Sequence, residues 1–192
     1  MVKISKVAFA AMLSVGSLGF AFSSVPQMAV SNVSASSISH MIRNGVVFKV
    51  GDTLNANLKI VEANINGTVK IAITALDATT VTIQEDADLQ IQKQVIVMVI
   101  NKTNGKVISV TVNGQPQQVP TSNPKIVKQE TATVTVPAGT YACLHLVLDD
   151  NGNQSEIWAD PKDIPINGLL KEVGKQQGYT VEMELTSFAF GA

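Results

Sequence analysis

The fold is decided by the stretch from Val95 to Gly114, which reads VIVMVINKTNGKVISVTVNG. It contains two runs rich in Val, Ile and Thr, and an Asn-Gly pair follows each run. Asn and Gly tolerate the positive φ angles of a type I′ turn, so such a pair between such runs is a strong hairpin signal. Six Asn-Gly pairs occur in the 192-residue chain, beginning at positions 44, 66, 104, 113, 151 and 167. They predict an antiparallel β meander.

The rest of the chain follows the same pattern of apolar and polar runs separated by turn residues. We predict strands over residues 46–50, 53–62, 67–76, 79–84, 88–102, 106–112, 126–136, 140–149, 154–159 and 179–188. The Pro-dense stretch 115–124 should be a loop or a strand edge, because proline cannot donate to a strand ladder. A short helix is expected over residues 37–43, with Ser37 as its N-cap.

The turn positions also predict which residues face each other across two strands. If Asn104 and Gly105 are the central turn residues, Met98 faces Thr111 and Ile100 faces Ser109. Residues 95–100 are apolar on both faces, which a sheet with one solvated side does not need. We therefore expect a helix, a second sheet layer or a bound apolar molecule to cover the second face. The candidate ligand-binding residues are Met98, Ile100, Ser109 and Thr111.

Two further hairpins give registers of their own. A turn at Asn66-Gly67 would pair Ile60 with Ile73 and Glu62 with Ile71. A turn at Asn151-Gly152 places Leu144 and Leu146 opposite Ala159 and Ile157 on a core face. Its other face gathers the most versatile side chains of the chain, namely Tyr141, Cys143, His145, Glu156 and Trp158.

This polar face does not predict an enzyme. Cys143 and His145 share a strand face, but residues two apart are about 6.5 to 7 Å apart at the backbone, which is long for a direct hydrogen bond. No third group that would orient the imidazole is evident. A metal held by Cys143, His145 and Asp160 is not expected either, because His40, the only other imidazole, precedes the β region. We expect no catalytic residue, no metal and no cofactor.

The first 23 residues have the pattern of a secretory signal peptide. Lys3 and Lys6 precede an apolar run over 7–22, and Ala21-Phe22-Ser23 supplies small residues at the −3 and −1 positions of a cut before Ser24. We therefore expect export to the periplasm or the outside, and no membrane span in the mature chain. Residues 24–44 are a Ser-rich N-terminal segment, and 45–192 are expected to form a single β domain.

Composition excludes several classes of partner. The net charge is −1, or −3 once Lys3 and Lys6 are removed, since 12 basic then oppose 15 acidic residues. So weak a field, without a Lys/Arg cluster, does not favour nucleic acid. Charged residues make up 15% and hydrophobic residues 45% of the chain, which predicts a folded domain. The single cysteine, Cys143, allows no intramolecular disulfide.

Four segments of the C-terminal third carry a resemblance. They are PAGTYAC at 137–143, IWADP at 157–161, IPINGLLK at 164–171 and ELTSF at 184–188. In this order they resemble uncharacterised bacterial exported proteins whose fold is similar to that of the periplasmic lipoprotein carriers. The resemblance implies a strongly curved antiparallel sheet, an unclosed half-barrel, with one or two short helices or loops in its concavity. In the carriers this concavity is an apolar cup for acyl chains, but their ligand-binding Arg has no counterpart here, because Arg43 is the chain's only Arg.

The sequence thus predicts a mainly β, exported, non-enzymatic protein, with a half-barrel as the first architecture and a β-sandwich as the alternative. Its expected function is to hold a hydrophobic ligand, acyl or lipid-like, in the concavity of the sheet. The alternative is a structural or protein-interaction module of the cell envelope that pairs with an envelope protein through exposed strand edges. The oligomeric state is left open.

Overall fold

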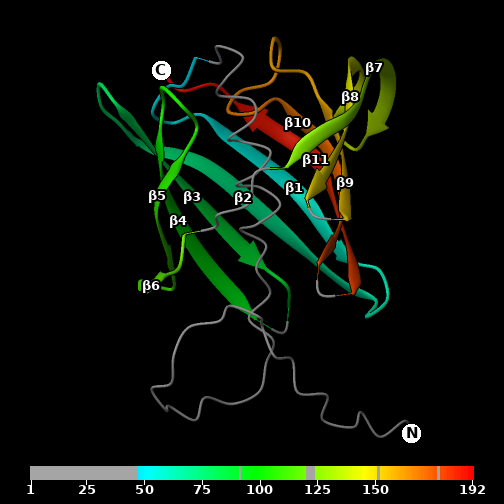
Figure 1. The fold of residues 1–192 in the computed structure, drawn as a ribbon, viewed down its shortest axis with the longest axis horizontal. Coiled ribbons are helices and arrows are strands. Elements are labelled where there is room, and N and C mark those ends of the chain that lie inside the picture. Colours follow the sequence, from blue (N-terminus) through cyan, green and yellow to red (C-terminus); the bar gives the residue numbers. More distant parts are fainter. Residues whose placement is uncertain (1–46, 91, 120–123, 151, 177) are drawn as a thin grey trace, which may run out of the picture.

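A computed structural model describes residues 47–90, 92–119, 124–150, 152–176 and 178–192 of the chain. These residues form one antiparallel sheet of eleven strands (Figure 1). The strands are β1 (Thr53–Ile60), β2 (Ile65–Leu76), β3 (Thr80–Asp88), β4 (Lys93–Asn101), β5 (Val107–Val112), β6 (Gln115–Gln117), β7 (Lys125–Val136), β8 (Gly139–Asp150), β9 (Asn153–Ala159), β10 (Leu169–Gln176) and β11 (Tyr179–Ala189).

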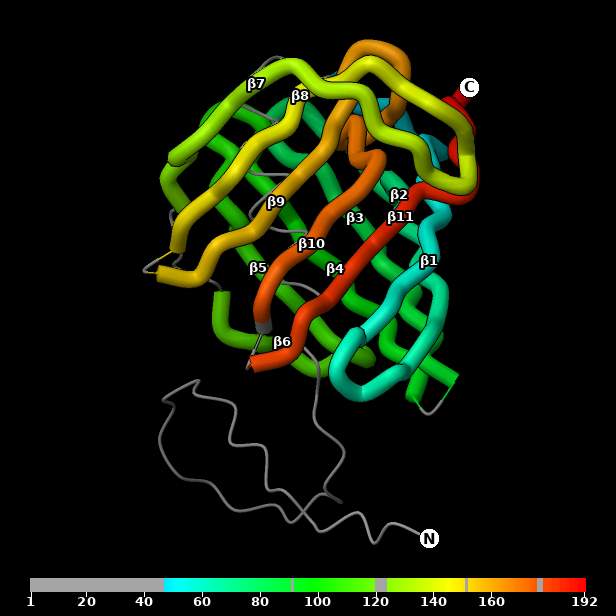
Figure 2. Tube along the Cα trace, turned by 90° about the vertical axis from the view of Figure 1, so that its right-hand side faces the viewer, coloured from blue at the N-terminus to red at the C-terminus, as the bar shows by residue number. Residues whose placement is uncertain are grey.

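The sheet consists of two meanders joined by the first and last strands. Its order is β6-β5-β4-β3-β2-β1-β11-β10-β9-β8-β7, so β1 pairs with β11 at the centre and β6 and β7 are the two edges. Figure 2 shows the C-terminal strands β8 to β11 lying in front of β2 to β5, so the sheet curves back over itself. The edges do not pair with each other. The structure therefore has the open, strongly curved architecture expected first, and it is one continuous sheet rather than two separate ones.

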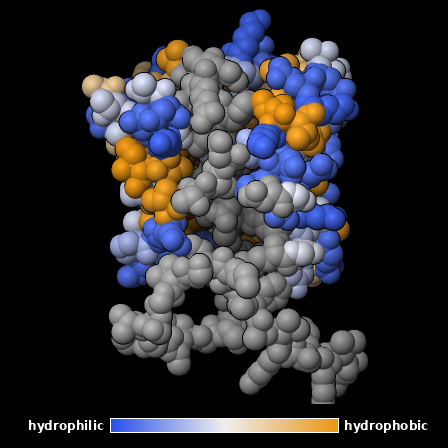
Figure 3. All heavy atoms as spheres, in the orientation of Figure 1, coloured by the Kyte–Doolittle hydropathy of each residue, from blue (hydrophilic) through white to orange (hydrophobic). Residues whose placement is uncertain are grey.

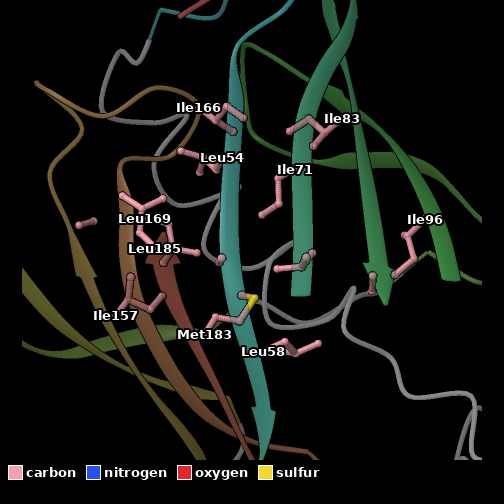
Figure 4. Packing of buried hydrophobic residues seen from close by; sticks show 14 of the residues in the cluster. Leu54, Leu58, Ile71, Ile83, Ile96, Ile157, Ile166, Leu169, Met183 and Leu185 are labelled. Atoms are coloured by element: carbon pink, nitrogen blue, oxygen red, sulfur yellow. The ribbon is translucent and has the colours of Figure 1, made fainter. Parts of the chain in front are cut away.

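The concave side of this sheet holds the hydrophobic core. Away from the bulges, residues alternate between faces along the strands, and the inward positions of both meanders are buried. The inward set includes Leu54, Leu58, Ile71, Ile83, Ile96, Ile157, Met183 and Leu185, whose side chains point into a common interior (Figure 4). Burial of this apolar surface is the main force that keeps the two halves of the sheet folded towards each other.

One end of the interior is covered by the loop between β9 and β10. The backbone N–H of Asp160 donates to Gly168 O at 2.8 Å, and that of Gly168 donates to Pro165 O at 3.1 Å. Ile164 and Ile166 of this loop are buried in the core. Ile166 has a φ of +63°, a conformation that β-branched residues rarely adopt. Burial of its side chain offsets the cost of that backbone.

Most predicted strands are present, with four differences. Residues 47–50 form no strand, the strand predicted over 79–84 extends to Asp88, the strand predicted from residue 88 begins only at Lys93, and β10 was not predicted. Residues 115–117 of the Pro-dense stretch pair as the short edge strand β6, which agrees with the expected strand edge. The described part of the chain contains no helix, and hence none that could span a membrane. The expected helix over 37–43, the signal peptide, the Ser-rich segment and Asn44-Gly45 lie outside the described residues.

The register predicted around Asn104-Gly105 is wrong by one residue. Met98 pairs with Val110 and Val99 with Ser109, because the connection spans residues 102–106 instead of two. Asn101 causes this longer loop: its N–H donates to Lys106 O at 2.8 Å, and its Oδ1 accepts the N–H of Thr103, also at 2.8 Å. A shift of one residue moves every side chain of one strand to the other face relative to its partner.

The register predicted around Asn66-Gly67 is also wrong, because this pair lies inside β2. The chain reverses earlier, over residues 61–64, and Ile60 pairs with Ile65. Gly67 serves close approach instead of a turn, since a Cβ there would lie 2.3 Å from Asp88 O. By contrast, Asn113-Gly114 is a two-residue turn with positive φ at both positions, and the predicted register between β8 and β9 is confirmed.

Replacement of Gly168 by Ala should destabilise the protein by about 2 kcal/mol or more. Gly168 has a φ of +70°, and an added Cβ would lie 2.4 Å from the backbone N of Pro161. Gly152→Ala is the matched control, because Gly152 also has a positive φ but nothing lies within 4 Å of its added Cβ. We expect this control to cost about 1 kcal/mol. Urea denaturation measures both, and equal losses would contradict the close approach.

Candidate functional site in the interior of the sheet

Three polar side chains lie among the apolar residues of the interior. Glu85 of β3, Gln94 of β4 and Glu172 of β10 are 0%, 2% and 1% exposed. Each occupies an inward position of its strand: Glu85 pairs with Ile71 and Ile96, and Glu172 pairs with Ile157 and Met183. Burial of polar groups in such surroundings costs free energy unless they are hydrogen-bonded, so their presence needs an explanation.

Curvature of the sheet brings the two glutamates together. Three strands, β2, β1 and β11, separate β3 from β10. In a flat sheet four strand spacings would separate them by about 19 Å. Yet the Glu85 carboxylate acts electrostatically on Glu172. Both carboxyl groups therefore lie on the interior side of the sheet, one from each meander, close enough for the charge of one to act on the other.

The interior strongly disfavours the ionised form of Glu172. Burial raises the pKa of the Glu172 carboxyl to about 8, and the negative charge of Glu85 raises it further in the same direction. Neither carboxyl oxygen of Glu172 has a hydrogen-bond partner among the residues that the structure describes. At neutral pH this group is therefore mostly a neutral acid, ready to lose its proton if a positive charge approaches.

Gln94 adds an amide to the same region. It pairs with Ala87, and Glu85 lies diagonally across the ladder on the same face. Both its Oε1 and its Nε2 are buried and have no hydrogen-bond partner in the described part of the chain. An unpaired buried amide costs roughly 1–3 kcal/mol. The interior thus combines an apolar lining with one carboxyl group, that of Glu172, and one amide, that of Gln94, that make no hydrogen bond within the described part of the chain.

The four predicted ligand-binding residues do not share a face. Met98 and Ile100 point into the interior and are completely buried. Ser109 is exposed and pairs with Val99 on the outer face, and Thr111 pairs with Val97 there. The one-residue shift of register separates the two pairs. No helix or second sheet layer of the described chain covers Val97 and Val99, which lie half-buried on the outer face.

The residues of the predicted polar face lie on the outer side of the sheet. His145 stacks on Trp158 with ring centroids 4.4 Å apart. Its Nε2 lies 2.9 Å from Glu156 Oε2, and its Nδ1 lies 3.0 Å from Glu130 Oε1. Lys128 donates to the same Glu130 oxygen at 2.7 Å, and both groups lower the pKa of Glu130. These contacts join the outer faces of the neighbouring strands β7, β8 and β9.

Tyr141 and Cys143 do not join this network. The Tyr141 hydroxyl donates to Ala138 O at 3.2 Å, which fixes the end of the β7–β8 hairpin. Cys143 is 8% exposed, and its Sγ lies 3.6 Å from Ala132 O. Burial raises the pKa of the Cys143 thiol, and the negative charge of Asp160 raises it further. The thiol is thus held in its unreactive protonated form.

Sequence reasoning missed Glu85, Gln94, Glu172 and Glu130. Two of them carried a period-two signal. Glu85 continues the alternating apolar positions 81, 83 and 87, and Gln94 precedes 96, 98 and 100. The predicted strand 79–84 ended one residue before Glu85, so its inward position was not recognised. Glu172 was missed because β10 was not predicted. The described residues contain no group of three His, Cys, Asp or Glu side chains that could hold a metal ion.

Comparison with known proteins places the fold but no family. No known protein family and no curated protein matches the sequence. Among solved structures, the hypothetical protein CT021 of Chlamydia trachomatis is similar with a TM-score of 0.54 and 11% identity, over 82% of this chain and 94% of that chain. This likeness confirms, at the level of the fold, the expected resemblance to uncharacterised bacterial proteins.

Two more distant structures have TM-scores below 0.5. A Pseudomonas aeruginosa complex of MucA and MucB matches with a TM-score of 0.46 and 13% identity, over 83% of this chain and 58% of that chain. A protein from Bacteroides fragilis, inferred to be exported and with a YmcC-like fold, matches with a TM-score of 0.39 and 10% identity, over 74% of this chain and 97% of that chain.

The raised pKa of Glu172 should make stability depend on pH. Glu172 ionises near 4.5 when unfolded but near 8 when folded, so the folded state binds more protons between these values. The free energy of unfolding therefore includes the full contribution of protonated Glu172 below pH 4.5. That contribution is lost as the pH rises through 8, by up to about 1.4 kcal/mol per pH unit. When the pH is raised from 5 to 8, the free energy of unfolding of Glu172→Gln should therefore increase by at least about 1 kcal/mol relative to that of the unmodified protein.

Urea denaturation at the two pH values measures this gain. Glu182→Gln on the outer face of β11 is the matched control, and its stability difference from the unmodified protein should stay constant. A Glu172→Gln difference that is equally independent of pH would refute the interior placement of an ionisable Glu172.

Cys143 should resist alkylation while the protein is folded. Because the thiol is buried and its pKa is raised, iodoacetamide at pH 8 should modify the native protein at least about tenfold more slowly than the urea-unfolded chain. The chain has one cysteine, so the mass of the intact protein reports this site alone. Equal rates in both states would mean that the thiol is accessible and activated.

Proposed function

We propose that this chain is a non-enzymatic binding module of the bacterial cell envelope that holds a hydrophobic ligand inside its curved sheet. The observation that carries the proposal is the interior itself. An apolar surface contributed by both meanders encloses the Glu172 carboxyl and the Gln94 amide, which have no hydrogen-bond partner among the described residues. A protein selected for stability alone would place apolar side chains at such positions, since these remove the desolvation cost.

The open sheet supplies a route to this interior. The edge strands β6 and β7 do not pair with each other, and Figure 1 shows them on opposite flanks of the molecule, so the sheet is open between them. Exposed hydrophobic residues lie near both edges: Ile108 on β5, and Ile126 and Val127 on β7. In the view of Figure 3, hydrophobic patches lie on both flanks of the molecule, one near β5 and one near β7. Apolar rims favour entry of an apolar molecule.

The exported location is part of the same proposal. The signal-peptide pattern of residues 1–23 supports it, and no structural finding bears on those residues. An exported carrier of apolar ligands meets a practical need, because such ligands are poorly soluble in the water between or outside membranes.

A second candidate function is protein interaction through β7. No described strand pairs with the outer edge of β7, and residues 125–131 are exposed. Against strand addition, the edge is blunted by the bulge at Val127 and by Lys125 and Lys128, devices that oppose edge pairing. The other edge, β6, has three residues and contains Pro116. The interior therefore remains the first candidate site.

Binding of the neutral fluorescent probe N-phenyl-1-naphthylamine tests the first proposal. The protein should bind it with a Kd on the order of micromolar, and native mass spectrometry of protein from its own host should show bound lipid-like mass. Met98→Gln keeps the side-chain length but makes the lining polar, so it should weaken probe binding at least about tenfold. Val97→Thr is the control: Val97 is adjacent to Met98 but points outward, and threonine has the same shape as valine. This variant should not change probe binding.

Circular dichroism checks that both variants fold. An absence of probe fluorescence together with a ligand-free mass spectrum would overturn the ligand-binding function. If crosslinking in the native envelope then recovered a protein attached at β7, the interaction function would replace it.

A further inference from the structure

The edge strand β7 is secured differently along its two halves. At the end of its second half Val136 is buried in the core, and the N–H of Ala138, just beyond the strand, donates to Leu185 O at 3.0 Å. All side chains of its first half, residues 125–131, are exposed. This half therefore adds no apolar burial to its backbone ladder with β8, and such segments are among the first parts of a fold to open.

Glu130 gives this first half a side-chain contact to β8. Its Oε1 lies 3.0 Å from Nδ1 of His145, and the other ring nitrogen of His145, Nε2, lies 2.9 Å from Glu156 Oε2 on β9. The imidazole is largely buried and stacks on Trp158 of β9. One histidine on β8 thus bridges its two neighbouring strands.

The two carboxylate contacts of His145 require a particular protonation state. Ionised carboxylates only accept hydrogen bonds, and a neutral imidazole has one N–H. Both contacts are hydrogen bonds only when both ring nitrogens carry a hydrogen, that is, in the imidazolium. The stack on Trp158 favours the same form, since the face of an indole attracts a cation. Lys128 and His145 lower the pKa of the Glu130 carboxyl, so Glu130 stays ionised opposite the ring.

We propose that His145 is a pH-dependent clasp, which holds residues 125–131 of β7 against β8 as an imidazolium and releases them when the ring loses a proton. Histidine ordinarily changes its charge between about pH 5 and pH 8. The neutral ring donates to one carboxylate, and its bare nitrogen repels the other. Release exposes the backbone edge of β8 over residues 146–149, which pair with this half of β7. The inference goes beyond the proposed ligand function and does not depend on it.

The other charged groups near His145 do not replace the clasp. Lys128 donates to the same Glu130 oxygen at 2.7 Å, but both lie on β7, so this pair does not link two strands. Lys171 of β10 lies 6.0 Å from the stacked indole and donates to Glu184 of β11. The titratable and charged groups around the ring on the described strands are Lys128 and Glu130 on β7, Cys143 on β8, Glu156 on β9, Asp160 directly after β9, and Lys171 on β10.

Hydrogen–deuterium exchange followed by mass spectrometry tests the clasp on the purified protein at pH 6.0 and pH 8.0. The measured quantity is the protection of residues 125–131, corrected for the intrinsic pH dependence of amide exchange and divided by the protection of the central strands β1 and β11. We expect this ratio to fall at least about fivefold from pH 6.0 to pH 8.0, because one charge-assisted hydrogen bond is lost.

Variants distinguish the clasp from a histidine with a purely structural role. His145→Gln keeps a donor but cannot titrate, so the ratio should be low at both pH values. Glu130→Gln removes the charge that attracts the imidazolium, so it should reduce the pH effect to less than about twofold. Glu184→Gln is the matched control: it removes the ion pair with Lys171, which contains no histidine, and should leave the pH effect on β7 unchanged.

Three results would overturn the proposal. The first is equal protection of residues 125–131 at the two pH values in the unmodified protein. The second is a pH effect that persists in His145→Gln. The third is a loss of protection that spreads evenly over all strands, since this would be unfolding of the whole domain. If His145→Gln does not fold, Glu130→Gln and its comparison with Glu184→Gln still decide the proposal.

Discussion

Pairing of the first and last strands is the constraint on which the whole structure depends. β1 and β11 are hydrogen-bonded over their length, from Thr53 opposite Ala189 to Ile60 opposite Val181. This contact joins a meander that starts at residue 53 to one that ends at residue 189. Without it the two halves would be separate, small sheets, each with one unprotected apolar face. The end of the chain is tied to the same place, since Gly191 N–H donates to the buried Asp52 carboxylate at 2.9 Å.

The joined sheet resolves the problem of two apolar faces by curving, and this has a chemical consequence. Inward side chains from strands far apart in the sheet share one interior, so the charge of Glu85 acts on Glu172 although the two residues are 87 positions apart in the chain. Curvature without closure leaves two edges, and both are blunted by short length, proline, lysine or a bulge. The interior, rather than the edges, is where the chain departs from what stability alone requires.

Local rules predicted the strands and turns where a single short-range interaction decides them. The Asn151-Gly152 hairpin was predicted with its register, so Leu146 opposite Ile157 and His145 opposite Trp158 are confirmed. Prediction failed where a side chain competes with the turn. Asn101 lengthens the β4–β5 loop and shifts its register, and Gly67 serves close approach to Asp88 rather than a turn. A glycine in a turn and a glycine at a close approach of two backbones look alike in sequence, because both positions need a residue without a Cβ.

By itself, the sequence determined that the chain is a β protein of antiparallel hairpins, with an export signal pattern at its start and one cysteine. These properties follow from composition and from residues within a few positions of each other. Tertiary structure alone decided that β1 pairs with β11, that the sheet stays open, and that Glu85, Gln94 and Glu172 share one interior. Those facts depend on contacts between residues more than a hundred positions apart or on the curvature of the whole sheet, which no local pattern encodes.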